Sequence, residues 1–204
     1  MFQITPMVKC GFDLLLAALA LLLFAPLLAV LGIAVRLSSD GPALFCQERI
    51  GRYGRVFVLF KFRTMHVLKG TENGSFDAGN VSRITSFGRF LRKTKLDELP
   101  QLWNVLTGDM ALVGPRPEVR KWVEVYPDRW ATVLTVRPGI TDPASIVYRD
   151  EEEILARSAD PERTYREEIL PHKLSLYEEY VHSRSFLGDI GIIFKTLKVV
   201  AKVQ

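Results

Sequence analysis

Cysteine and histidine are scarce in this chain of 204 residues. The two cysteines, Cys10 and Cys46, form no CxxC motif and are too few for a disulfide framework. The three histidines lie far apart and share no Cys/His spacing typical of a zinc site. The sequence therefore excludes a disulfide-stapled secreted domain and gives no support to a structural zinc centre.

The chain also lacks a Gly-rich phosphate loop, internal repeats and low-complexity tracts. Neither a Walker motif nor GxGxxG is present, so P-loop and dinucleotide-binding folds have no sequence support. Apolar residues make up 48% and charged residues 25%, which is typical of a globular protein and excludes overall disorder. The net charge of +4 suits phosphates, anionic lipids or nucleic acid and does not choose among them.

The longest apolar run lies near the N-terminus, from Leu14 to Val35, and carries no charged side chain. A straight helix of that length covers roughly 33 Å, enough to cross a hydrocarbon core of about 30 Å. A cleaved signal peptide is disfavoured because Arg36 follows directly, without a small-residue cleavage site. Pro26 lies near the middle, and proline removes a helical hydrogen bond. The run therefore predicts either one kinked span or two short arms that enter and leave the membrane on the same side.

The remaining chain predicts short, mixed elements. Residues 44–49 and 56–62, separated by Gly51–Gly54, are expected to form a β-hairpin. Helical patterns cover 85–91, 96–106 and 118–130, and residues 151–180 predict two charged helices broken near Asp160-Pro161 and Pro171. Stiff turns are expected at 114–117 and 137–141, and a flexible loop at 70–80.

The last helix is expected over residues 188–203. Its apolar side carries Ile192, Ile193, Leu197 and Val200, and another side carries Lys195, Lys198 and Lys202. A basic amphipathic helix is typical of an anionic membrane surface, although the solvated face of a packed helix shows the same pattern.

Two adjacent carboxylates, Asp97 and Glu98, follow three cations within residues 92–95. Pro100 is tolerated in a first helical turn and Thr94 is a plausible cap, so both carboxylates are expected at a helix N-terminus. The positive end of the helix dipole favours an ionised aspartate, which is a competent nucleophile toward phosphorus. The plainer alternative is that the two carboxylates only favour the dipole and pair with neighbouring lysines.

Several cations stand in stiff surroundings. Lys61 and Arg63 follow the core of a predicted strand, Arg116 lies between two prolines, and Arg137 precedes Pro138-Gly139. Arginine on a stiff loop loses little entropy when it makes a bidentate contact with phosphate. With Arg92, these residues form the candidate substrate-binding set.

The order and spacing of these motifs resemble those of bacterial sugar transferases of the monotopic phosphoglycosyl transferase family, over nearly the whole chain. The matching blocks are Gly11-Phe12-Asp13, Gly41-Pro42, Arg49-Ile50-Gly51, Gly54 with Phe57, Lys61–Met65, Leu96–Val105, Gly108–Met110, Val113–Glu118 and Arg137–Thr141.

The resemblance implies a reaction. A sugar-1-phosphate passes from a UDP-sugar to a polyprenyl phosphate, usually undecaprenyl phosphate, with Mg²⁺, and UMP leaves. This is the first membrane step in making a glycoconjugate such as a capsule, O-antigen or exopolysaccharide. The resemblance makes Asp97 the nucleophile and a Mg²⁺ ligand, with Glu98 as its partner.

The resemblance also implies an α+β fold. Residues 1–36 would form a re-entrant membrane helix hairpin broken at Pro26. Residues 37–204 would form a mainly helical cytosolic catalytic domain with a small β-hairpin and amphipathic interfacial helices. The expected location is the bacterial inner membrane, with the site on the cytosolic face and inner-membrane lipids as partners. No basic patch interleaved with aromatics is visible, so no nucleic-acid partner is expected. The oligomeric state stays open, with a homodimer as one option.

Some positions depart from the family pattern. Many members have Ser before the hairpin proline, where this chain has Ala25. Many members continue Gly-x-Ala-Gln-Val-Asn-Gly-Arg where this chain has Asp-Pro-Ala-Ser-Ile-Val-Tyr-Arg at residues 142–149. The identity of the sugar substrate is therefore not inferred from the family. The alternative function is a non-catalytic anchor or regulator that binds polyprenyl phosphate. That alternative explains the apolar run and the cations but not the pair Asp97-Glu98.

Overall fold

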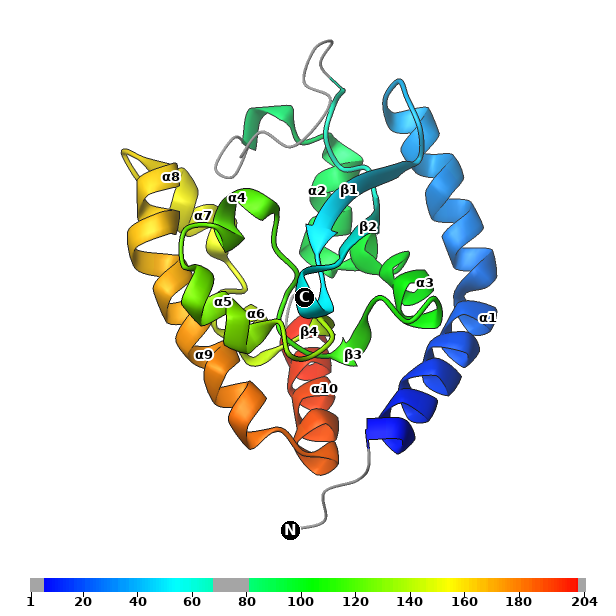
Figure 1. Cartoon of the computed structure of the whole chain (residues 1–204). Helices are drawn as coiled ribbons and strands as arrows, with labels where there is room; N and C mark the ends of the chain where they lie inside the picture. Colours follow the sequence, from blue (N-terminus) through cyan, green and yellow to red (C-terminus); the bar gives the residue numbers. More distant parts are fainter. Residues whose placement is uncertain (1–5, 68–80, 202–204) are drawn as a thin grey trace.

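The computed structural model describes residues 6–67 and 81–201, so the loop expected at 70–80 and Lys202 lie outside the described residues. The described chain is mainly helical with two small sheets, as predicted for an α+β fold (Figure 1). Its strands are β1 (Leu44–Ile50), β2 (Val56–Phe62), β3 (Ala111–Val113) and β4 (Gly139–Thr141). Its α-helices are α1 (Pro6–Ser38), α2 (Ser86–Thr94), α3 (Gln101–Leu106), α4 (Arg120–Val123), α5 (Pro127–Val133), α6 (Pro143–Val147), α7 (Glu151–Ala156), α8 (Pro161–Thr164), α9 (Leu170–Ser183) and α10 (Phe186–Ala201).

The first helix differs from the predicted hairpin. α1 is one continuous α-helix of 33 residues, and Pro26 lies inside it. Figure 1 shows α1 bent about its middle, with both ends turned toward the rest of the chain. Proline cannot donate the hydrogen bond that the Leu22 carbonyl would otherwise accept, which weakens the helix here and permits a bend. Two separate arms are therefore not confirmed, and the structure has a bent helix instead.

α1 presents an apolar surface to the outside. Within the described residues, Met7–Ser38 is the one helix long and apolar enough to cross a membrane. Side chains that stay more than half exposed on this helix include Leu15, Leu19, Leu22, Leu23, Val30 and Ile33. Ala17, Leu31 and Val35 are buried on the opposite side. α1 therefore packs on the protein through a narrow stripe and leaves a wide apolar surface uncovered.

The β-hairpin is confirmed. β1 pairs antiparallel with β2, in a register that runs from Leu44 opposite Phe62 to Ile50 opposite Val56. Between the strands lies the 3-10 turn Arg52–Gly54, where Tyr53 and Gly54 both have positive φ, as a tight reversal requires. Lys61, near the end of β2, lies opposite Phe45 of β1.

A short parallel pair was not predicted. Residues 137–141 were expected to form only a stiff turn, but β4 pairs with β3. The backbones approach so closely that a Cβ at Gly139 would lie 2.1 Å from the Gly114 nitrogen. Only glycine fits such a contact, so two glycines far apart in the sequence permit this pairing.

Two of the predicted helices are divided differently. The helix expected over 118–130 is two helices, α4 and α5, because Pro127 cannot continue a helix and starts a new one. Pro171 does not end a helix: a π-helical turn, Tyr165–Ile169, leads directly into α9. The predicted break at Asp160-Pro161 is confirmed, with Asp160 as the N-cap of α8. The remaining 3-10 turns are Val81–Arg83 and Leu96–Glu98.

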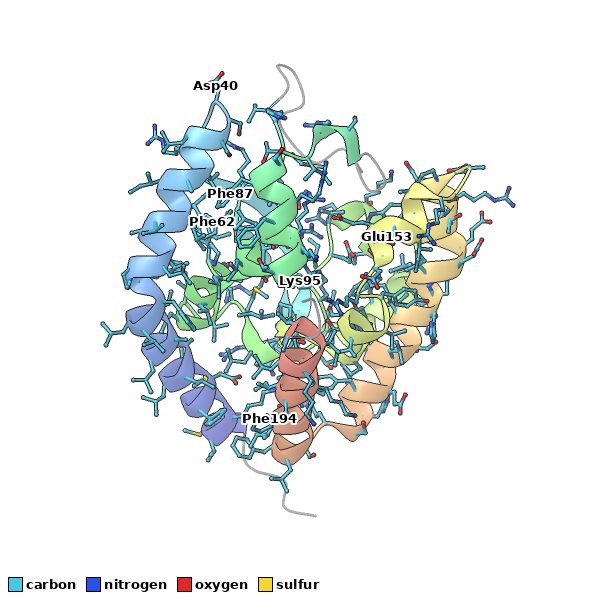
Figure 2. All side chains as sticks on the ribbon, turned by 180° about the vertical axis from the view of Figure 1, so that it is seen from behind. Asp40, Phe62, Phe87, Lys95, Glu153 and Phe194 are labelled. Atoms are coloured by element: carbon cyan, nitrogen blue, oxygen red, sulfur yellow. The ribbon has the colours of Figure 1, made fainter. Side chains whose placement is uncertain are left out.

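Three apolar clusters hold these elements together. One lies among α4 to α9 around Trp122, Trp130, Leu155, Tyr165 and Tyr177. The second joins Ala17 of α1 to β2, α3, β3 and Tyr180. The third joins Leu31 and Val35 of α1 to Phe62 and Leu91, and Figure 2 shows Phe62 and Phe87 together beside α1. Because α1 shares two of the clusters, it is packed as part of the fold.

Candidate active site

The chain reverses sharply just before the two adjacent carboxylates. α2 ends at Thr94, whose hydroxyl donates to the carbonyls of Phe90 (2.8 Å) and Leu91 (3.2 Å). Lys95 follows in the left-handed conformation, with φ 58°, and Figure 2 shows it at the end of α2 near the middle of the molecule. The prediction that Thr94 caps the following helix is therefore wrong, because Thr94 closes the preceding one.

Asp97 and Glu98 lie in a 3-10 turn and not in the first turn of an α-helix. The turn spans Leu96–Glu98, and α3 begins only at Gln101, after Pro100. α3 has six residues, so its dipole is small. Asp97 is 7% exposed, and burial is therefore the larger influence on its ionisation.

Glu98 forms the centre of a partly buried ion-pair cluster. Its Oε1 accepts from Nη2 of Arg116 at 2.5 Å and from Nζ of Lys61 at 3.3 Å, and its Oε2 accepts from Nη1 of Arg116 at 3.3 Å. The bidentate Arg116 contact and the Lys61 charge hold the pKa of Glu98 below its usual range, although burial acts in the opposite direction. Burial lowers the pKa of Lys61 to about 8, and the Glu98 charge opposes that effect. The Glu98 charge in turn raises the pKa of Arg116.

Asp97 has the opposite character. Burial, with the neighbouring Glu98 charge adding to it, raises the pKa of Asp97 to about 6, against the charges of Lys61, Lys95 and Arg92. Its Oδ1 is buried and has no hydrogen-bond partner among the residues that the structure describes. The sequence led us to expect a helix dipole that keeps this aspartate ionised, whereas the structure shows a desolvated carboxylate that binds its proton more tightly.

The two carboxylates therefore divide their roles. Glu98 is firmly ionised and fully engaged by cations, while Asp97 is ionised near neutral pH and keeps an unpartnered oxygen. Neighbouring titratable groups whose pKa values are pushed apart are typical of acid, base or nucleophile assignments in catalysis. The arrangement suits attack by Asp97 on an electrophile whose negative charge the nearby cations stabilise.

Arg92 lies beside this cluster. Its Nε donates to Oγ1 of Thr64 at 2.8 Å, and its Nη1 donates to Oε1 of Glu152 at 2.5 Å. The positive charge of Arg92 also acts to lower the pKa of Asp97, against the effect of burial. Lys61, Arg92 and Arg116 are thus the predicted substrate-binding cations that the fold brings around the two carboxylates.

Arg63 and Arg137 make their contacts elsewhere. Arg63 is 6% exposed and donates from Nη2 to the carbonyls of Ser39 (2.7 Å) and Val35 (3.4 Å), which closes the C-terminal end of α1. Nη1 of Arg137 donates to Sγ of Cys10 at 3.0 Å, near the start of α1. The structure therefore does not bring these two arginines into the carboxylate cluster. Strand adjacency placed Arg63 in the candidate set, but its side chain points to α1.

A divalent cation bound here would have few protein ligands and would need water or a bound phosphate to complete its coordination shell. Within residues 6–67 and 81–201, no group of three or more Asp, Glu, His or Cys side chains could form a dedicated metal cage. Mg²⁺, however, usually takes one or two carboxylates and completes its shell with water and substrate phosphates. The Asp97 carboxylate would supply one such ligand.

A second buried polar group adjoins the cluster. Glu118 is 7% exposed and bonds to Arg49 and to the hydroxyl of Tyr165. The sequence presented Arg49 and Glu118 only as parts of matching blocks, without a role. One sequence feature indicated that Glu118 lies close to the site: it follows Arg116 by two residues in the run Gly-Pro-Arg-Pro-Glu.

Comparison with known proteins supports the resemblance. The profile of the family described as bacterial sugar transferase matches residues 4–203. The chain is 36% identical over 197 residues, 95% of this chain and 43% of the relative, to a UDP-N-acetylgalactosamine-undecaprenyl-phosphate N-acetylgalactosaminephosphotransferase of Aeromonas hydrophila. It is 38% identical over 199 residues, 94% of this chain and 39% of the relative, to a UDP-glucose:undecaprenyl-phosphate glucose-1-phosphate transferase of Escherichia coli.

A shorter relative matches over most of its own length. The chain is 34% identical over 210 residues to the exopolysaccharide production protein ExoY of Rhizobium meliloti, covering 95% of this chain and 85% of that protein. By contrast, the chain spans about two fifths of the length of the Aeromonas and Escherichia relatives. These relatives are named for different sugars.

Proposed function

The chain belongs to the bacterial sugar transferase family, and from that premise we propose that it is a phosphoglycosyl transferase that moves a sugar-1-phosphate from a UDP-sugar to undecaprenyl phosphate. The observation that carries the proposal is Asp97, a buried carboxylate with an unpartnered oxygen among cations. A binding protein for polyprenyl phosphate has no need of such a desolvated anion, whereas a nucleophile for phosphoryl transfer does.

The proposed reaction has two displacements at one phosphorus atom. Oδ1 of Asp97 attacks the β-phosphorus of the UDP-sugar, the bond from that phosphorus to the bridging oxygen breaks, and UMP leaves with the bonding electrons. A phosphate oxygen of undecaprenyl phosphate then attacks the same phosphorus and releases the Asp97 carboxylate. The product is undecaprenyl-diphosphate-sugar. Lys61, Arg92 and Arg116 would neutralise the phosphoryl oxygens.

Mg²⁺ is the proposed cofactor, and Asp97 would hold it with the diphosphate. When bound, it supplies charge neutralisation to the phosphate oxygens. Glu98 would keep Lys61 and Arg116 in position, because both cations already contact its carboxylate.

The test is UMP release. The full chain, purified in lipid or detergent, would be incubated with a panel of UDP-sugars, undecaprenyl phosphate and Mg²⁺, and UMP would be measured. We expect one or a few sugars to support UMP release and a lipid-diphosphate-sugar product. No UMP from any UDP-sugar, despite binding of undecaprenyl phosphate, would favour the non-catalytic anchor instead.

The pH dependence of UMP release should follow the two shifted groups. Asp97 attacks only when ionised, and its raised pKa of about 6 means that kcat/KM falls as the pH drops through 6. Lys61 must be protonated, and its lowered pKa of about 8 means that kcat/KM falls again as the pH rises through 8. Lys61→Arg keeps a positive charge and should remove the alkaline fall. An alkaline fall near pH 8 that persists in Lys61→Arg would contradict the role of this lysine.

The bent helix supports a proposed topology. Both ends of α1 turn toward the rest of the chain in Figure 1, and its outward face is apolar. We place the bend in the cytosolic leaflet of the inner membrane, with residues 1–10 and residues from 36 onward both on the cytosolic side. The active site would then lie at the cytosolic surface, where UDP-sugars are available. An N-terminal tag should stay unlabelled by impermeant reagents in intact cells.

Substitution of the helix proline should disturb this topology. Pro26→Leu restores the missing backbone donor and should favour a straight helix, which moves the site relative to the membrane plane and lowers UMP release. Leu27→Ala, an apolar change at the neighbouring position, serves as the control and should leave the tag and the activity unchanged. Periplasmic labelling of the tag in the unaltered protein would contradict the re-entrant arrangement.

A further inference from the structure

We propose that Glu118 is a positioning residue, which fixes the loop that carries Arg116 and so holds Arg116 against Glu98. The inference rests on the proposed function, because it assigns Glu118 a part in the same reaction. Glu118 touches neither Asp97 nor Glu98 in any described contact, and its effect would pass through the loop Gly114–Glu118.

One side of this loop is fastened to β4. The Gly114 nitrogen donates to the Thr141 carbonyl at 3.1 Å, and the Gly139 nitrogen donates to the Pro115 carbonyl at 3.0 Å. These bonds extend the close approach of the two glycine backbones and fix the start of the loop.

The other side is fastened to β1. The Ile50 nitrogen donates to the Glu118 carbonyl at 2.8 Å, and Nη1 of Arg49 donates to the Pro117 carbonyl at 3.1 Å. Arg116 therefore lies between two anchored ends, with proline on each side restricting the backbone. The side-chain bonds of Glu118 strengthen the anchor on the β1 side.

The Glu118 carboxylate is fully engaged although it is buried. Oε2 accepts from Nη1 of Arg49 at 3.1 Å and from the Val119 nitrogen at 3.2 Å, and Oε1 accepts from the Tyr165 hydroxyl at 2.5 Å. Burial alone would raise the pKa of Glu118, but the charges of Arg49 and Lys173 and these hydrogen bonds hold it below its usual range. Because Arg49 belongs to β1, these contacts tie the Glu118 carboxylate to the strand that borders the loop.

The local backbone favours this contact. Tyr165 begins the π-helical turn, a rare conformation that is frequent at functional sites. Its ring packs on Trp122 with centroids 4.8 Å apart, which fixes the direction of the hydroxyl. Nζ of Lys173 lies 3.4 Å from this hydroxyl and 3.0 Å from Oε2 of Glu151, so the network reaches α7 and α9.

Glu118 also balances a charge near the site. The positive charge of Arg49 helps to lower the pKa of Lys61, repels the charge of Arg116 and attracts that of Glu98. Without the Glu118 carboxylate, Arg49 would compete with Lys61 and Arg116 for the Glu98 anion. Loss of Glu118 would therefore loosen Arg116 both mechanically and electrostatically.

The first measurement is a double-mutant cycle on UMP release. Each rate would be divided by the burst of UMP released without acceptor, which counts active molecules and removes misfolded ones. Glu118→Gln should slow the normalised rate by about tenfold, because it removes the negative charge that pairs with Arg49. Tyr165→Phe should slow it by about threefold, because it removes the hydroxyl that donates to Glu118. Glu178→Gln is the matched control. It removes the carboxylate of α9 that pairs with Arg129 of α5, and it should change the rate less than about twofold.

The cycle separates a positioning role from a general structural role. If Glu118 acts through Arg116, then Glu118→Gln should slow an Arg116→Lys enzyme less than about twofold further. An undiminished tenfold effect in that background would overturn the proposal, as would a wild-type normalised rate in Glu118→Gln. Should Glu118→Gln fail to fold, Tyr165→Phe takes its place in the cycle.

Thermal unfolding gives a readout that does not need catalysis. The decrease in Tm for Glu118→Gln combined with Arg116→Ala should be smaller than the sum of the two single decreases, because both changes weaken one anchored loop. Additive decreases would overturn the positioning role. Absence of UMP release from the unaltered protein would contradict the proposed function alone, and the unfolding cycle would then decide whether Glu118 and Arg116 are coupled.

Discussion

Replacing Asp97 with asparagine should abolish UMP release, with a loss of at least about 10³-fold. Asparagine keeps the shape of the side chain but has no anionic oxygen, so it cannot form the proposed phosphosugar-aspartyl intermediate. The loss should appear already without acceptor, because the first displacement needs only the UDP-sugar. Asp128→Asn, at an exposed position in the first turn of α5, is the matched control and should retain wild-type activity.

The unaltered protein provides the complementary measurement. With UDP-sugar and no acceptor it should release up to about one equivalent of UMP and leave a phosphosugar mass on a peptide containing Asp97. UMP release that depends strictly on acceptor, with no trapped adduct, would contradict the covalent intermediate and favour direct transfer in a ternary complex. Glu98→Gln should impair turnover and still allow some covalent loading, because Asp97 keeps its carboxylate.

Replacing Arg116 with alanine should lower both activity and stability. Within the described part of the chain, the change leaves the Glu98 carboxylate, whose side chain is 13% exposed, with only the longer Lys61 contact at 3.3 Å. Removal of one partner from a buried ion pair typically costs about 3–5 kcal/mol, and the partial exposure of Arg116 places this pair at the lower end, about 3 kcal/mol. UMP release should fall by about 10²-fold or more, because one phosphate-neutralising cation is also lost.

Arg116→Lys separates charge from geometry. Lysine keeps the positive charge but loses the planar fork that meets both Glu98 oxygens, so an intermediate loss of about tenfold is expected. Arg120→Ala, four residues along the chain and largely exposed, is the control and should change neither rate nor Tm. The measurements are UMP release at low and saturating UDP-sugar, and thermal unfolding. Wild-type turnover by Arg116→Ala at low UDP-sugar would contradict the role.

The local sequence determined much of the fold. The β-branched and aromatic residues and the Gly-bracketed turn predicted the hairpin of β1 and β2, and the Asp160-Pro161 break was correct, because both depend on neighbouring residues alone. The order of the motifs also determined the family. The pairing of β3 with β4 was missed because strands of three residues have no pattern of their own and depend on a distant close contact.

The site was predicted in composition but not in arrangement. The sequence singled out Asp97, Glu98 and Arg116, and the structure brings Arg116 and Lys61 onto Glu98. The sequence could not show that the Arg63 side chain would turn to the end of α1, since the direction of a side chain after a strand depends on what packs against that strand. The local reading of Asp97 relied on a helix dipole, whereas its raised pKa comes from burial, a property of the whole fold.

Residue type and order alone therefore determined the apolar run, the turns and the set of side chains available for chemistry. The reason is that propensity, periodicity and proline geometry act over a few residues. Only the tertiary structure decided which carboxylate is engaged and which keeps a free oxygen, which arginines meet them, and that Pro26 bends one helix instead of separating two. The physical reason is that desolvation, ion pairing and close backbone approach arise between segments that lie far apart in the chain.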